Sequence, residues 1–352
     1  MTTMKEIARR TGVSISTVSL VLNDRDAGRV KPKTAVHVRR IAKELGYQPN
    51  PLARSLRTSK TRILGFISEE IATTPYAGGM ILGAQDAASR LGYVMLTVNT
   101  EGIASADDEI AALRRYGVDG FVYAKMFNCL TSVPSSLTSL PFVLADAQDE
   151  EHRSPSITPD EIQIGYDATR RLITAGCSRI AYIGSLDPML AQGQRLVGHL
   201  QALKDAGLDL GPGMQINVSG NEAALAAIDR LIESEHPDGF FCFNDARAMQ
   251  LYLCAARHGL HIGEDISVVG VDNHRVFAET LSPRLTSVEL PHYEMGFWAV
   301  SKLVSLIERQ NPPKAVLPPP GRDTAPLPSF ESVPAKIHCR LIEKESVQSG
   351  GF

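Results

Sequence analysis

From residue 62 onward, short apolar runs alternate with longer amphipathic segments, and this alternation restricts the fold more than any other feature. The apolar runs have the length of buried strands, and the intervening segments have the length of helices. Strands connected through helices pair in parallel and need helices on both faces of the sheet. The expected strands are 63–68, 93–99, 120–125, 142–146, 179–185, 239–245 and 266–272, and the expected helices are 77–91, 107–116, 160–175, 191–206, 222–234, 246–258 and 292–309.

The body is long for a single sheet of this kind, because hydrophobic cores stop growing beyond about 250–300 residues. We therefore predict two α/β lobes and a last strand within the closing RLIEKESV. The expected division is a first lobe of about 62–157 and 291–311, a second lobe of about 158–289 and 335–346, a Pro-rich surface excursion at 312–334 and a tail at 347–352.

Charge is distributed unevenly along the chain. The first 62 residues carry a net charge of +10, and the remainder carries −13. A basic head on an acidic body is typical of a nucleic-acid-binding module joined to another domain, although a basic solvated terminus would look the same. The five cysteines form no CxxC pair, and we find neither an apolar leader nor a membrane-spanning run. We therefore expect a cytoplasmic protein without a membrane partner.

Two short helices joined by a tight turn are predicted within residues 3–23. Thr3 and Glu6 match a capping box, and Gly12 suits the left-handed end of a helix. Ser14 then caps the second helix. This spacing predicts a helix-turn-helix.

A third helix is predicted from Pro32 to Leu45, with Val36, Ile41 and Leu45 packed on the first two helices. Pro49 and Pro51 bar its continuation. The segment after Pro51 can form only a very short helix, which is too short to be stable alone in water.

Sequence motifs for the common enzyme classes are absent. No GxGxxG follows a strand, and the chain contains no GxxxxGK[ST], HExxH or GxSxG. The nine histidines have no metal-binding spacing. We therefore expect no enzyme activity, no cofactor and no metal.

The head, KEIARRTGVSISTVSLVLN followed by VKPKTAVHVRRIAKELGYQPNPLARSL, closely resembles the DNA-binding head of the LacI/GalR family of bacterial transcription regulators. The body resembles the same family in DGFVY, RRLITAGCSRIAYIGS, FNDARA and EDISVVGVDN. The resemblance implies an all-α helix-turn-helix head at 1–48, a hinge at 49–61 and a two-lobed α/β body at 62–346. In this body, which is similar to periplasmic binding proteins, helices flank parallel sheets.

The resemblance implies that Ile15, Ser16 and Leu20 read bases in the major groove. Ile15 and Leu20 are aliphatic, so contacts with thymine methyl groups are expected, unless these side chains pack inside the head. It also implies phosphate contacts from small polar side chains that could instead be helix caps or solvated groups: Thr3, Ser14, Thr17, Ser19 and Asn23.

The family's hinge places a leucine in the minor groove, and Leu56 matches that position. Ala53 would allow two hinge helices to approach closely, and Arg57 would lie along the groove. A packing role for Leu56 is the alternative.

The resemblance further implies an effector site between the lobes, formed by Tyr76, Asp146, Arg195, Asn244 and Asp272. Carboxylates and a guanidinium that face one cleft can form charge-assisted hydrogen bonds with hydroxyls or ring nitrogens. Each could instead be a structural ion pair, a cap or a core residue.

Four features depart from the family pattern, and one of them is the length of the Pro-rich stretch at 312–334. His199 stands where an aromatic residue is more usual, and Glu69 and Glu70 lie in the first-lobe mouth. We expect Trp298, the only tryptophan, to pack away from the cleft.

These features together predict an effector-responsive DNA-binding transcription regulator, most simply a repressor, that binds a palindromic operator as a homodimer in association with the nucleoid. A sugar or sugar derivative is the first expectation for the effector, and a purine or nucleoside is the second. A solute-binding protein for transport and a non-specific nucleoid-binding protein are the alternatives.

Overall fold

The structure is a computed structural model, and the chain divides into two compact units, Met1–Arg62 and Ile63–Phe352. Among the described residues, no helix is long and apolar enough to cross a membrane. The described residues are 2–47, 60–69, 71–74, 77–100, 106–187, 189–309 and 324–348.

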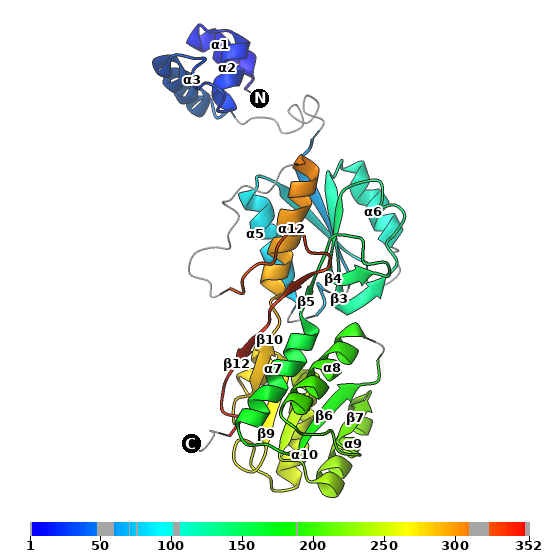
Figure 1. The fold of residues 1–352 in the computed structure, drawn as a ribbon. Coiled ribbons are helices and arrows are strands. Elements are labelled where there is room, and N and C mark those ends of the chain that lie inside the picture. Colours follow the sequence, from blue (N-terminus) through cyan, green and yellow to red (C-terminus); the bar gives the residue numbers. More distant parts are fainter. Residues whose placement is uncertain are drawn as a thin grey trace. The chain divides into compact units, whose positions relative to one another are not determined.

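The first unit is all-helical, as the sequence predicts (Figure 1). Its three helices are α1 (Met4–Thr11), α2 (Ile15–Leu22) and α3 (Pro32–Glu44). Gly12 ends α1 at φ 66°, a left-handed conformation that glycine adopts without strain. The small core is formed by Ile7, Ala8, Val18, Val21, Ala35, Val38, Ile41 and Ala42.

One packing expectation for this unit is wrong. Val36 does not pack on the first two helices, because its side chain is 66% exposed. The inward stripe of α3 contains Ala35, Val38 and Ile41, and Leu45 is partly buried against the same core. Val36 lies outside this stripe, so the helical period places it toward solvent.

The first lobe is built on a six-stranded sheet in the order β11-β5-β4-β3-β1-β2, with every pair parallel. Helices α5 (Gly78–Arg90) and α12 (His292–Glu308) cover one face, and α6 (Ala106–Arg115) covers the other (Figure 1). The strands are β1 (Ile63–Ser68), β2 (Val94–Asn99), β3 (Gly120–Thr131), β4 (Phe142–Asp149), β5 (Ser156–Pro159) and β11 (Ala335–Ile337).

The second lobe has a six-stranded sheet in the order β12-β10-β9-β8-β6-β7, in which β12 alone runs antiparallel to its neighbour. Helices α7 (Glu161–Thr174) and α8 (Leu190–Asp205) pack on one face, and α9 (Asn221–Glu235) and α10 (Asp245–Arg257) pack on the other. The remaining elements are β6 (Ile180–Ser185), β7 (Gln215–Val218), β8 (Gly239–Cys242), β9 (Ser267–Asp272), β10 (Thr286–Glu289), β12 (Arg340–Ile342) and the short helix α11 (Arg275–Ala278).

Alternation along the strands explains why each sheet has two cores. In β8, Phe240 packs with α9 and α10, whereas its neighbour Phe241 packs with α7 and α8. Successive strand side chains point to opposite faces, so an uninterrupted apolar strand requires helices on both.

Glycines set the closest helix contacts. A Cβ on Gly83 of α5 would lie 1.8 Å from the backbone oxygen of Tyr293 in α12, and one on Gly296 would lie 1.9 Å from that of Met80. In the second lobe, a Cβ on Gly165 of α7 would lie 1.9 Å from the backbone oxygen of Arg195. The contact at Gly165 sets the distance between α7 and α8, and therefore the position of Arg195.

One boundary differs from the expected ones. We expected 335–346 to lie in the second lobe, but β11 (Ala335–Ile337) pairs with β5 in the first sheet. The register Ala335–Ile157 gives β11 hydrogen-bonding partners in the first lobe, so the chain passes to the second lobe only after β11.

The expected excursion at 312–334 is partly described. Trp298 Nε1 donates a hydrogen bond to Pro328 O at 2.9 Å, so the part of this segment around Pro328 packs on α12. Trp298 itself is fully buried.

Candidate functional site

The beginning of α2 presents the side chains expected to read bases. Ile15 is 50% exposed and Ser16 is exposed, so neither belongs to the head's core. Leu20, one turn further on, is partly buried. An exposed aliphatic side chain beside a hydroxyl at a helix N-terminus is a surface suited to base edges and thymine methyl groups.

Three of the small polar residues of the head serve as local helix caps. Thr3 Oγ1 accepts a hydrogen bond at 3.3 Å from a backbone N–H in the first turn of α1, and Ser14 Oγ accepts one at 3.1 Å from Thr17 N. Asn23 Nδ2 donates to Ser19 O at 2.7 Å. Capping is thus observed for these three residues, and Thr3 and Ser14 remain exposed, where a phosphate could also be contacted.

Several predicted positions lie outside the described residues. They are Ala53, Leu56 and Arg57 of the hinge, Tyr76 of the effector site, and Glu70.

A pocket lies where the carboxyl ends of the two sheets face each other, and four of the predicted effector residues line it. Asp146 comes from β4 of the first lobe, whereas Arg195, Asn244 and Asp272 come from the second. The space between the pocket walls is about 320 Å³, and this volume includes open solvent at the mouth. Its lining is Met126, Phe127, Asp146, Pro159, Glu161, Arg195, Phe243, Asn244, Asp272 and Leu290.

Asp146 is held by backbone groups of the irregular stretch of β3. Its two carboxylate oxygens accept hydrogen bonds at 3.0 Å from the N–H groups of Phe127 and Asn128. All three residues have positive φ, a conformation that aspartate and asparagine tolerate better than most residues do. Burial raises the pKa of Asp146 to about 7, and the nearby Glu161 carboxylate adds to the rise.

Arg195 is committed to partners within the second lobe. Its Nε donates to Glu161 Oε2 at 2.7 Å, and its Nη1 donates to Phe243 O at 2.7 Å. Both charged side chains are nearly inaccessible, with 4% of Arg195 and 1% of Glu161 exposed. The guanidinium also lies 4.7 Å from the centre of the Phe243 ring, a cation–π contact.

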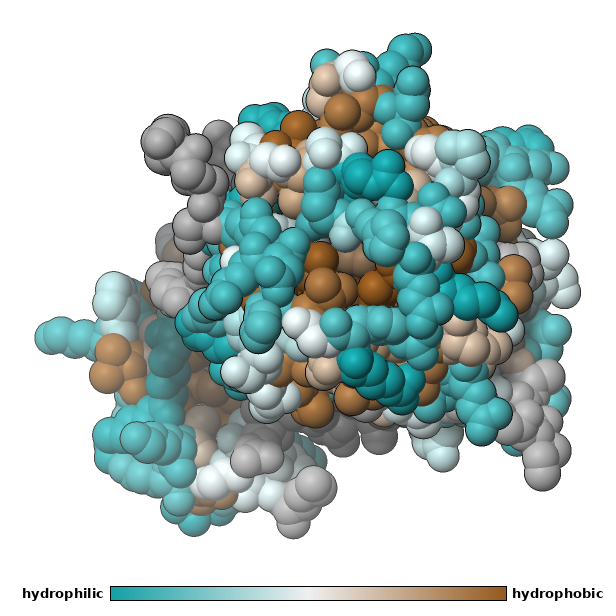
Figure 2. All heavy atoms as spheres, turned by 90° about the horizontal axis from the view of Figure 1, so that it is seen from below, coloured by the Kyte–Doolittle hydropathy of each residue, from teal (hydrophilic) through white to brown (hydrophobic). Residues whose placement is uncertain are grey.

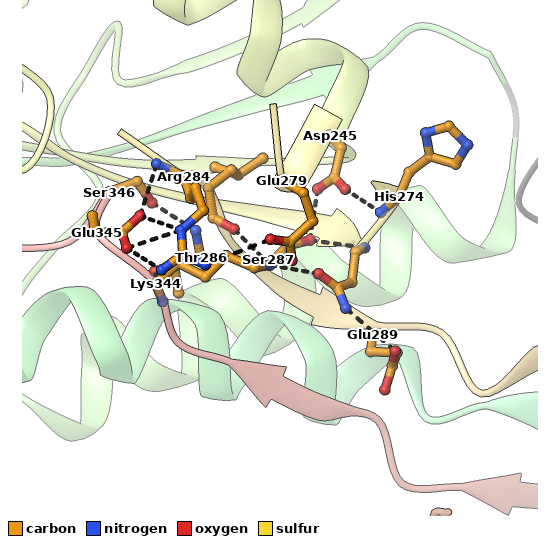
Figure 3. Close-up of polar contacts among 12 residues, drawn as sticks. Asp245, His274, Glu279, Arg284, Thr286, Ser287, Glu289, Lys344, Glu345 and Ser346 are labelled. Atoms are coloured by element: carbon orange, nitrogen blue, oxygen red, sulfur yellow. Dashed lines mark hydrogen bonds and ion pairs between the residues drawn. The ribbon is translucent and has the colours of Figure 1, made fainter. Parts of the chain in front are cut away.

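Asp272 ends β9 with φ 109°, and a polar network holds the loop that follows (Figure 3). Asp245 accepts hydrogen bonds from Ser287 Oγ at 2.6 Å and from the backbone N–H two residues after Asp272 at 2.7 Å. Lys344 Nζ donates to Asn273 Oδ1 at 2.6 Å. The C-terminal segment therefore fixes the loop that carries Asp272.

These buried carboxyl groups are electrostatically linked. Burial raises the pKa of Asp245 to about 7. Burial, followed by the neighbouring Asp245 charge, also raises the pKa of Asp272 well above its ordinary value, while Arg195 opposes the rise. Perturbed carboxyl groups in one cleft are a mark of functional sites as well as of ion-pair networks.

Asn244 has a structural task in addition to its place in the pocket. It is the N-cap of α10, and its Oδ1 accepts a hydrogen bond from Arg247 N at 3.0 Å. Its Nδ2 group can still donate to a molecule in the cleft.

Two departures from the family pattern are now accounted for structurally. His199 is fully buried, and its Nδ1 lies 2.8 Å from Thr169 Oγ1. Burial lowers the pKa of His199 to about 4, so it is a neutral core residue. Glu69 accepts a hydrogen bond from the Tyr123 hydroxyl at 2.6 Å and pairs with Lys125 Nζ at 2.8 Å, so its charge is compensated locally.

A second pocket lies at the opposite edge of the second sheet, before β8 and β9. Figure 2 looks onto this end of the second lobe and shows hydrophobic side chains at the base of a hollow framed by hydrophilic ones. None of the residues predicted for a site lines the pocket. Its lining is Ile232, Glu233, His236, Pro237, Asp238, His258, Leu260, Asp265 and Ile266.

Comparison with known proteins identifies the family. The model of bacterial regulatory proteins of the lacI family matches residues 3–50, and that of periplasmic binding protein-like domains matches 169–324. The HTH-type transcriptional regulator RegA of Clostridium saccharobutylicum is 33% identical over 318 residues, which are 88% of this chain and 93% of that protein. The chain belongs to the LacI family.

Further relatives agree with this assignment. The HTH-type transcriptional repressor PurR of Vibrio atlanticus (strain LGP32) is 33% identical over 323 residues, 90% of this chain and 95% of that protein. The solved structure of the transcriptional regulator CelR–cellobiose complex has a TM-score of 0.62 at 25% identity and covers 98% of this chain and 100% of that one. Relatives of this LacI-family chain are transcription regulators and not enzymes, so it is a DNA-binding transcription regulator with an effector-binding body.

Six of the residues that line the cleft of this LacI-family protein were missed from the sequence, and Glu161 and Phe127 show why. Glu161 opens a predicted helix, where an acidic residue ordinarily indicates favourable interaction with the helix dipole. Phe127 lies beyond residue 125, the expected end of its strand, so no sequence feature predicted that it would line the effector cleft. The sequence feature that could have indicated a buried ion pair at Glu161 is its position beside apolar helix residues, because a carboxylate buried there needs a partner.

Proposed function

We propose that occupation of the cleft by a small effector changes the affinity of a homodimer for a palindromic operator, and that the protein acts as a repressor. The observation that carries this proposal is the origin of the cleft residues. Asp146 belongs to the first lobe, whereas Arg195 and Asp272 belong to the second. A ligand that bonds to both lobes stabilises one arrangement of them over others, and such differential binding is what shifts a conformational equilibrium.

Within this proposal, Ile15, Ser16 and Leu20 contact bases, and Leu56 of each subunit enters the minor groove between them. Ala53 and Arg57 would then line the same hinge contact. The exposure of Ile15 and Ser16 at the start of α2 supports the first part. The five small polar residues of the head would make the phosphate contacts, and the protein would act in the cytoplasm, where the DNA lies.

We propose a sugar or sugar derivative as the effector, bound by Asp146, Arg195, Asn244 and Asp272, with Tyr76 over the ligand. The CelR complex contains cellobiose, which supports the sugar class. A purine or nucleoside is the second candidate. The carboxylates and the asparagine amide offer acceptors and a donor for hydroxyl groups, and Phe127 offers an apolar surface in the same pocket.

Selection of binding sites from random duplex DNA tests the DNA half of the proposal. The enriched sequence should be a palindrome, and scrambling one half-site should reduce affinity by at least 1000-fold toward the non-specific level. Enrichment of no defined sequence, with equal affinity for random DNA, would instead support the nucleoid-binding alternative.

A further inference from the structure

Carboxyl groups outnumber basic groups in the cleft. Asp146, Glu161 and Asp272 line it, and Arg195 is the single basic side chain among the described lining residues. The neighbouring Asp245 charge raises the pKa of Asp272 further. A ligand in this pocket therefore meets three carboxyl groups against one guanidinium.

The positive charge of the guanidinium is already compensated by a carboxylate within the protein. Arg195 donates to Glu161 through Nε and to the backbone oxygen of Phe243 through Nη1. A phosphate or carboxylate bound to the remaining N–H groups of Arg195 would place a second anion beside Glu161, whose side chain is 1% exposed. Two anions that share one buried guanidinium repel each other, so the ion pair disfavours anionic ligands.

Neither of the other two carboxyl groups has an ion-pair partner among the residues that the structure describes, and each can accept a cation. Asp146 receives one backbone N–H on each oxygen, and each carboxylate oxygen retains a further acceptor site. Burial raises the pKa of both Asp146 and Asp272, so each gains stability in its charged form when a positive charge arrives. An ammonium group supplies that charge and three hydrogen-bond donors.

We propose that the effector is a polyhydroxylated molecule that carries an amino group, and that the cleft selects it over neutral and anionic counterparts. This inference rests on the proposed function of the cleft as the effector site. The hydroxyl groups pair with the remaining polar groups, such as Asn244, while the ammonium lies between Asp146 and Asp272. Phe127 and Leu290 supply the apolar side of the pocket.

The test measures binding of matched sugars by calorimetry and thermal shift on the full-length protein. The probes are glucose, galactose and mannose, each with its 2-amino and 6-phosphate derivatives, at pH 7 and low salt. At least one amino sugar should bind at least tenfold more tightly than its parent, and no phosphate should exceed its parent. An effective dielectric constant of about 20 makes one uncompensated charge at contact distance sufficient for a tenfold difference.

Charge-neutralising variants link this preference to the named residues. Glu161→Gln leaves Arg195 without its charged partner. The ratio of the affinity for the amino sugar to that for the sugar phosphate should therefore fall at least tenfold. Glu343→Gln is the matched control, because Glu343 is 60% exposed, pairs with Arg171 and does not line the cleft. It changes the net charge equally and should leave the preference intact.

Preference for a phosphate or a neutral sugar would overturn the inference, as would the absence of binding by every amino sugar at 10 mM. Those outcomes are distinguishable from failure of the proposed function, because selection of a palindromic operator and its response to any other ligand are measured separately. An equal loss of preference in Glu161→Gln and Glu343→Gln would also overturn it, since net charge alone would then be responsible.

Discussion

Removing one member of the Arg195–Glu161 pair should destabilise the body far more than removing a surface pair does. The two side chains are almost inaccessible, and their atoms lie 2.7 Å apart. Breaking a buried pair leaves an uncompensated charge and costs about 3–5 kcal/mol. Arg195→Met should lie at the upper end of that range, because it also removes the hydrogen bond to Phe243 O.

The magnitude is best obtained from a double-mutant cycle. Glu161→Leu combined with Arg195→Met leaves no buried charge, so the double variant should be more stable than the sum of the single losses predicts, by at least about 2 kcal/mol. The pair Arg171–Glu343 is the matched control, with Glu343 60% exposed and a distance of 3.0 Å. Its coupling should stay below about 1 kcal/mol.

Urea unfolding at pH 7 provides the assay. Fluorescence of Trp298, the only tryptophan, reports the first lobe, and circular dichroism reports the whole chain. If the fluorescence and circular dichroism transitions coincide, unfolding of the body can be described by a single free energy. Additive single losses, or a coupling no larger than that of the surface pair, would refute the reasoning.

Three further predictions concern other parts of the molecule. In urea unfolding, Gly83→Ala should lower the stability of the body by at least about 2 kcal/mol, because its Cβ would lie 1.8 Å from a backbone oxygen of α12. Gly79→Ala is the control and should be neutral or stabilising, because its Cβ would have no neighbour closer than 3.5 Å. Burial raises the pKa of Asp245 to about 7, so ionisation of this carboxyl group destabilises the folded state as pH rises from about 4 to 7. The free energy of unfolding of Asp245→Asn should therefore increase relative to that of wild type between pH 5 and 8. A difference between the two proteins that stays constant with pH would contradict this. Exchanging Ile15 and Ser16 should change the half-site preferred in binding-site selection and leave affinity for random DNA within about threefold; uniform loss would rule out base reading.

Periodicity predicted most of the framework, because long segments that must be buried repeat their apolar residues regularly. The helices expected at 160–175 and 191–206 are α7 (Glu161–Thr174) and α8 (Leu190–Asp205). Short strands were harder: β5 (Ser156–Pro159) and β7 (Gln215–Val218) have four residues each and too few positions to show a period.

The polar cleft was only partly predictable for a different reason. Asp146 and Asp272 follow apolar strands, and the carboxyl ends of parallel strands meet at one edge, so their meeting in one pocket could be anticipated. The pairing of Arg195 with Glu161 could not, because it depends on how closely α8 packs on α7. That distance is set by Gly165 and Gly198, which read in sequence as ordinary helix interruptions.

Operator affinity measured with and without cleft ligand tests the central claim most directly. Fluorescence anisotropy would give the Kd for the selected palindrome in wild type and in Asp272→Asn, a variant that keeps the shape of the side chain and tolerates its positive φ. The ligand would be whichever sugar in the panel stabilises the protein most. Saturation should change the wild-type Kd at least tenfold and leave Asp272→Asn unchanged, with equal affinities in the absence of ligand. An unaltered Kd for ligand-saturated wild type, or the same change in both proteins, would contradict control of DNA binding through this cleft.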